Sequence, residues 1–208
     1  MAIAGTETSR APIQDLRFKA AGFLSFLNAV LVLSLVVISL DDDLKMKAGL
    51  LFFIHLPLSS ISGAIEIYVL IQLKRLLYER YDIRNMNSII TALIFCSILW
   101  WVKSFVMAFM VIIFPNPDII LPLDGILVVF CFLMSGIAGL IMGNRLLQIT
   151  DESSGLLRNY AEKCKGSSIC YLTVILIPIG IVIGLINNIV LGILLLQEAE
   201  TEPQVDFV

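Results

Sequence analysis

The residues best suited to chemistry are a few polar side chains inside long apolar runs. His55, Ser59, Ser62 and Glu66 follow one another at intervals of four, three and four residues, which places them on one face of a helix. Such a stripe is typical of an ion or proton path, because His and Glu are the usual relay groups in membranes. It is also typical of a hydrogen-bonded seam between helices. We favour the seam, because channels usually carry more charge than this.

Lys103 is the other unusual charge. It lies about fifteen residues into its apolar run, where a lysine costs about 2.5–3.5 kcal/mol on insertion scales. At helical rise, Glu66 lies ~12 Å and Lys103 ~22 Å from the same boundary of the apolar region. We hypothesise that these two charges neutralise one another within the bundle, either directly or through a connecting water.

The composition narrows the chemistry further. His55 is the only histidine, so a bis-histidine haem, a histidine-rich metal site and a di-iron centre lack ligands. A role as single axial ligand to haem or chlorophyll is left open for His55. No nucleophile elbow, Walker A loop or zinc-protease motif occurs in the sequence. We therefore expect no metal site, no cofactor and no catalysis by the polypeptide alone.

The elements that must hold these residues are long apolar runs separated by short charged loops. The chain has 15% charged residues and a mean hydropathy of +0.96, whereas a soluble domain has about 25% charged residues. Each run is near or above the ~20 residues needed to cross a hydrocarbon core, and backbone in lipid must be helical. We predict an all-α membrane protein with five transmembrane helices, at Ala20–Leu40, Gly49–Leu73, Ser88–Phe114, Gly125–Gly143 and Ile169–Leu196.

The charge distribution predicts the orientation of these helices. Most Lys and Arg residues fall in the tail and loops on one side of a five-pass topology, and most Asp and Glu residues on the other. By the positive-inside rule the N-terminus is cytoplasmic and the C-terminus outside. One transmembrane domain then covers 1–208, with a cytoplasmic tail at 1–19, a bundle at 20–196 and an acidic tail at 197–208. Asp124 is positioned to cap the fourth run.

The loop between the fourth and fifth runs contains a helical pattern of its own. Leu156, Tyr160 and Cys164 recur every four residues, the spacing of one apolar helix face. We predict a short cytoplasmic amphipathic helix here. Two placements stay open: in the inner headgroup region, or packed against the ends of the spans.

Small residues at four-residue spacing indicate close helix packing in lipid. Asn28 in the first run, and Asn188 in the last, are interpreted as polar packing groups rather than ligands. The small residues that form such rows are Ser135, Gly139, Gly143, Gly180, Gly184 and Gly192.

These features favour a non-catalytic structural or accessory subunit that packs within a larger membrane complex. The alternative is a small proton- or ion-linked transporter or channel that uses Glu66, Lys103 and His55. The expected partners are the lipid bilayer and other membrane subunits or further copies of the chain. A net charge of −3 gives no reason to expect a nucleic acid partner. The absence of N-glycosylation acceptors and C-x-x-C pairs favours the inner membrane of a bacterium or archaeon.

Overall fold

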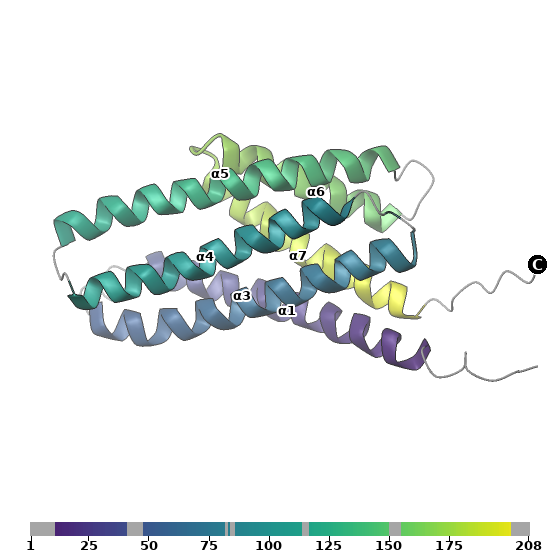
Figure 1. The fold of residues 1–208 in the computed structure, drawn as a ribbon, viewed down its shortest axis with the longest axis horizontal. Helices are drawn as coiled ribbons and strands as arrows, with labels where there is room; N and C mark the ends of the chain where they lie inside the picture. Colours follow the sequence, from purple (N-terminus) through teal and green to yellow (C-terminus); the bar gives the residue numbers. More distant parts are fainter. Residues whose placement is uncertain are drawn as a thin grey trace, which may run out of the picture.

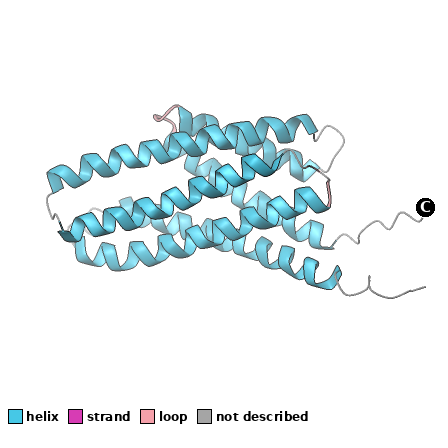
Figure 2. Cartoon of the chain, in the orientation of Figure 1, coloured by secondary structure: helices cyan, strands magenta, loops and turns pink. Residues whose placement is uncertain are grey.

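The described part of the chain is entirely helical. The computed structural model describes residues 11–40, 48–81, 83, 86–113, 117–149 and 155–200. The helices are α1 (Ala11–Leu40), α3 (Ala48–Glu79), α4 (Asn87–Ile113), α5 (Pro117–Ile149), α6 (Gly155–Leu172) and α7 (Ile177–Glu200), as Figures 1 and 2 show. Five of them, all except α6, are long and apolar enough to cross a membrane. The predicted all-α class and the five apolar helices are confirmed.

The helices form a ring in which each packs mainly against its two neighbours. The cyclic order is α1, α3, α4, α5, α6 and α7, and α7 closes the ring against α1. Neighbours run antiparallel, since α1 meets α3 at Asn28 and Ser62 and also at Arg17 and Gln72. The apolar faces that point into the ring bury one another, as expected for helices whose backbone hydrogen bonds are satisfied internally.

The helix α6 runs within the ring, antiparallel to α5. Gly136 of α5 faces Leu172, near the end of α6, while Gly143 faces Ala161, near its beginning. A helix therefore occupies the segment where the sequence predicts one, and it packs along a span and against α7. The helix is too polar to count among the candidate spans, and the sequence analysis left two placements open for it, in the inner headgroup region or against the ends of the spans.

Because α6 enters the ring, the start of α1 and the end of α7 lie together. Ser25 of α1 donates to the carbonyl of Asn188 at 2.7 Å, and Gly22 faces Gly192, so α1 and α7 are antiparallel. Tyr81, just beyond α3, donates to Glu198 Oε1 at the end of α7. This end of the bundle is on the right in Figure 1. The five-pass prediction instead puts the two chain ends at opposite ends of the bundle. Residues 1–10 and 201–208, which hold most of the predicted tails, lie outside the described residues.

The turn between α6 and α7 divides the apolar run that the sequence analysis assigned to one span. Ile169–Leu172 ends α6, and α7 begins only at Ile177. Val174 has a φ of 53°, and Thr173 Oγ1 donates to the carbonyl of Cys170 at 2.9 Å, so the chain reverses here. Pro178 stands in the first turn of α7, where its missing N–H breaks no helical hydrogen bond. In Figure 1 this turn stops well short of the end reached by α4 and α5.

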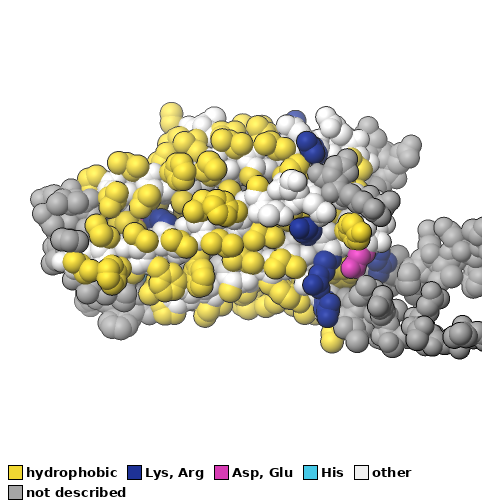
Figure 3. Space-filling model, viewed as in Figure 1, with side chains coloured by type: hydrophobic (Ala, Val, Ile, Leu, Met, Phe, Trp, Pro, Cys, Tyr) yellow, Lys and Arg dark blue, Asp and Glu magenta, His cyan; other side chains and the backbone are white. Residues whose placement is uncertain are grey.

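The surface and the core are both arranged as a membrane requires. Apolar side chains cover the flank of the bundle in Figure 3, and charged side chains gather at the end where α7 finishes. Inside that end, a layer of fully buried apolar side chains joins five helices. Its largest members are Leu73, Leu76, Leu77, Ile90, Met142, Leu146, Leu157, Leu194 and Leu195, each at most 1% exposed.

Candidate functional site

Glu66 is the charged residue nearest the middle of a span. The span in α3 runs from Ile54 to Glu79, so Glu66 lies about 18 Å from either end at helical rise. One turn away on the same helix face, Ser62 and Leu70 are only 6% and 8% exposed. Glu66 itself is exposed. Its side chain therefore lies on the inward face of α3 without being packed as tightly as Ser62 and Leu70.

The groups around Glu66 come from the opposite helices of the ring. Ser97 of α4 lies near its carboxyl group, and the Ser97 hydroxyl donates to the carbonyl of Leu93 in its own helix at 3.1 Å. Tyr160 and Tyr171 of α6 are close enough to interact with it electrostatically. Between Glu66 and the charged end of the bundle, the apolar layer fills the ring. The side chains that α3 and α5 contribute to this layer are fully buried.

An aromatic cluster closes the other side. The ring centroids of Trp100 and Phe132 are 5.0 Å apart. Those of Phe132 and Tyr171 are also 5.0 Å apart. The cluster therefore joins α4, α5 and α6 through an edge-to-face contact and a tilted ring contact. Trp100 lies one helical turn beyond Ser97 along α4, so the cluster separates Glu66 from the far end of the bundle.

Lys103 pairs with Asp124, and not with Glu66. The Lys103 ammonium lies 2.6 Å from Asp124 Oδ1, with the two side chains 15% and 40% exposed, and 5.5 Å from the centroid of the Trp100 ring. The predicted Glu66–Lys103 pair is therefore wrong. A long lysine side chain can extend toward the membrane boundary, and Asp124 stands only two residues inside the span that begins at Pro122.

The sequence analysis expected Asp124 to cap a helix, and this expectation is wrong. The helix α5 begins at Pro117, so Asp124 lies two turns inside it. His55 of α3 is partly buried and lies close enough to interact electrostatically with both Lys103 and Asp124. The structure thus gathers His55, Lys103 and Asp124 into one cluster, and it separates this cluster from Glu66 by the aromatic rings.

The serines of the predicted stripe have structural partners. Ser59 donates to the carbonyl of Leu56 within its own helix at 3.0 Å. Ser62 donates to Oδ1 of Asn28 across the α1–α3 contact at 2.6 Å, and both side chains are buried. This bond matches the interhelical seam that the sequence analysis favours.

The predicted small residues lie at helix contacts. Asn188 lies at such a contact too, but through its backbone and not its side chain. A β carbon at Gly139 or Gly143 would collide with Ser168 or with the backbone of α6. One at Gly180 or Gly184 would collide with Tyr171, and one at Gly192 with Gly22. At Asn188 it is the backbone carbonyl that accepts a bond from Ser25. The contact partners of Ser135 include Cys96 of α4.

The described residues contain no candidate metal site. Within the described ranges, no three His, Cys, Asp or Glu side chains converge. The cysteines Cys96, Cys131, Cys164 and Cys170 are buried and free.

Comparison of the chain with known protein families, with curated proteins and with solved structures finds no match. Any function must therefore be argued from the geometry described above.

The Lys103–Asp124 pair can be tested by a double-mutant cycle. We expect Lys103→Met and Asp124→Asn to lower the free energy of unfolding, and to show a coupling of about 0.5–1 kcal/mol, the range of partly exposed ion pairs. The matched cycle of Lys103→Met with Glu66→Gln should be additive, because those side chains do not pair. Reversible unfolding in mixed micelles measures both cycles. Coupling between Lys103 and Glu66 in place of Asp124 would contradict the observed pairing.

Proposed function

We propose that the chain is a non-catalytic integral membrane protein that packs as a structural or accessory subunit within a larger membrane complex. The observation that carries this proposal is Gly125 of α5. Eleven residues, close to three helical turns, separate it from Gly136, so the two glycines share a helix face. Gly136 packs against α6, whereas no described atom lies within 4 Å of a β carbon built at Gly125.

The reason for this difference is the length of α6. The helix ends at Leu172, which lies opposite Gly136, so among the described residues the glycine face of α5 continues past it without a neighbour. A glycine in a helix costs about 1 kcal/mol relative to alanine, and in membranes small residues let a second helix approach closely. The occupant that fits a narrow apolar face inside the bilayer is a transmembrane helix of another subunit.

The membrane side follows from the charges at the end where α1 begins. Near the start of α1 and the ends of α3 and α5 stand Arg17, Lys19, Lys74, Arg75 and Arg145, so by the positive-inside rule this end faces the cytoplasm. With α6 as an additional pass, both ends of the described chain would be cytoplasmic. The inner membrane of a bacterium or archaeon remains the membrane we propose.

Gly125→Leu tests the subunit role. We expect the wild type, tagged and extracted from its native membrane in mild detergent, to migrate above its 23.0 kDa chain mass with a stoichiometric partner. Gly125→Leu should lose that partner while keeping its helical content and melting temperature, because the new side chain enters open space. Native mass spectrometry measures both states.

Two control variants bracket this experiment. Ile126→Leu changes an adjacent side chain that is 67% exposed and should keep the partner. Gly139→Leu should lower the melting temperature of the chain itself, because its side chain would collide with α6. A wild-type protein that runs as a lone monomer, or a Gly125→Leu variant that retains the partner, would contradict the proposal; a complex of identical chains would assign the face to self-association.

A second candidate function is proton- or ion-linked transport, and the position of Glu66 favours it. A carboxyl group at the middle of a span is costly and is by default a functional candidate. In this conformation the apolar layer and the aromatic cluster stand on its two sides, so transport would require one of them to open.

Vesicle flux tests this candidate. If Glu66 carries the ion, purified protein in liposomes should conduct protons or cations, and Glu66→Gln should reduce that flux at least tenfold while Ser59→Ala leaves it unchanged. Flux that is absent in the wild type, or equal in Glu66→Gln, would eliminate this route.

A further inference from the structure

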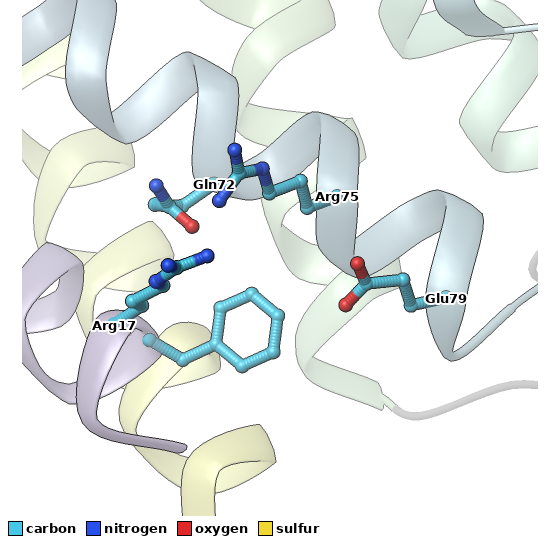
Figure 4. Close-up of a pocket in the computed structure, with 5 residues that line it drawn as sticks. Arg17, Gln72, Arg75 and Glu79 are labelled. Carbon is cyan, nitrogen blue, oxygen red and sulfur yellow. The ribbon is translucent and has the colours of Figure 1, made fainter. Parts of the chain in front are cut away.

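A polar pocket lies between α1 and α3 at the charged end of the bundle. It has a volume of about 240 Å³ and is lined by Arg17 and Phe18 of α1 and by Gln72, Arg75 and Glu79 of α3. Figure 4 shows the side chains of Arg17, Gln72 and Arg75 directed into the same space from two helices, with Glu79 at its edge. None of these residues takes part in the sites described above.

Gln72 contributes a buried polar atom without a partner to this pocket. Its side chain is only 3% exposed, and its Oε1 accepts no hydrogen bond from the described residues. A buried amide oxygen without a donor is costly, by about 1–3 kcal/mol. A ligand that brought a hydrogen-bond donor into the pocket would satisfy this oxygen.

The two guanidinium groups define the rest of the ligand. Within the described chain, no ion pair or hydrogen bond is recorded for Arg17 or Arg75. Two arginines that face one space from different helices are a typical phosphate site, since guanidinium binds phosphate through paired N–H groups. With the Glu79 carboxylate, the lining carries a formal charge of +1, which matches a phosphodiester.

The position of the pocket identifies the source of that phosphate. Arg17 follows Leu16, where the apolar span of α1 begins, and Arg75 lies near the end of the α3 span, so both stand at headgroup level. Below them, at seven-residue intervals on the same helix faces, come Leu24 and Leu31 on α1 and Tyr68 and Ile61 on α3. Leu24, Leu31 and Tyr68 are partly buried against the core and Ile61 is exposed, so these helix faces offer apolar surface suited to an acyl chain.

We propose that this pocket binds the headgroup of a phospholipid whose phosphate is joined to a hydrogen-bond donor, an ammonium or a hydroxyl group. Arg17 and Arg75 hold the phosphate, Gln72 Oε1 accepts from the headgroup donor, and Glu79 lies at the edge of the site on the same side. Basic pockets between transmembrane helices on the cytoplasmic side are suited to this role. The inference is independent of the subunit and transport proposals, because it uses a different seam of the ring.

Native mass spectrometry of the purified full chain tests the proposal. The probes are phosphatidylethanolamine, phosphatidylglycerol, phosphatidylcholine and inorganic phosphate, each added to delipidated protein. We expect one tight site for phosphatidylethanolamine or phosphatidylglycerol. It should weaken about tenfold or more in Arg17→Gln and in Arg75→Gln, because each removes a charge-assisted contact. Lys19→Gln, an equal charge change at an exposed neighbour, should leave it unchanged.

Phosphatidylcholine, inorganic phosphate and a Gln72 variant distinguish a phospholipid headgroup from other ligands. Phosphatidylcholine has no headgroup N–H or O–H, so it should bind less tightly, and Gln72→Leu should reduce this preference. Equal affinity for phosphatidylcholine would overturn the role of Gln72. Inorganic phosphate that binds as tightly as the lipids would assign the site to a soluble phosphate, and unchanged lipid binding in both arginine variants with intact melting temperatures would overturn the proposal.

Discussion

The close approach of α6 to α5 is the contact on which the rest of the structure depends. Gly136, Gly139 and Gly143 leave no side chain on one face of α5, so the backbone of α6 lies directly against it. Helices in lipid gain little from burying apolar surface and associate through such packing. This contact places α6, a comparatively polar helix, among the spans. After α6 the chain reverses, and α7 packs along α1, so α6 and α7 form a hairpin. The ring closes because this hairpin fills the gap between α5 and α1.

The same hairpin sets where the interior is packed and where it is polar. Toward the charged end, α6 and α7 complete the ring, and apolar side chains fill it without accessible surface. The hairpin turn, at Thr173–Leu176, ends before α4 and α5 do. Beyond it lie the exposed Gly125 and the cluster of His55, Lys103 and Asp124. Glu66 stands between these regions, with the aromatic rings on one side and the apolar layer on the other. The surroundings of Gly125, of the His55 cluster and of Glu66 thus depend on where α6 and α7 lie.

The sequence predicted the class of the protein and its apolar helices, because hydrophobic length and backbone satisfaction in lipid are local properties. It also singled out Glu66 and Lys103, since charges inside spans are conspicuous. The partner of Lys103 was missed because the sequence analysis placed Asp124 at the start of its span. Their positions on antiparallel neighbours, ten residues before the end of α4 and seven residues after the start of α5, are a signal that could have paired them. The placement of α6 was harder to predict, because its polar composition resembles a surface helix and only the glycines opposite it reveal its site.

The central claim is that α6 passes through the bundle, so that both ends of the described chain reach the same side. Its most direct test is the labelling of single-cysteine variants Lys19→Cys and Glu200→Cys in intact cells or sealed vesicles with a membrane-impermeant maleimide. Ile113→Cys, at the opposite end of the bundle, is the comparison. The structure predicts that positions 19 and 200 share one labelling pattern and that position 113 shows the reverse. Protection at 19 with labelling at 200, or the converse, would contradict it.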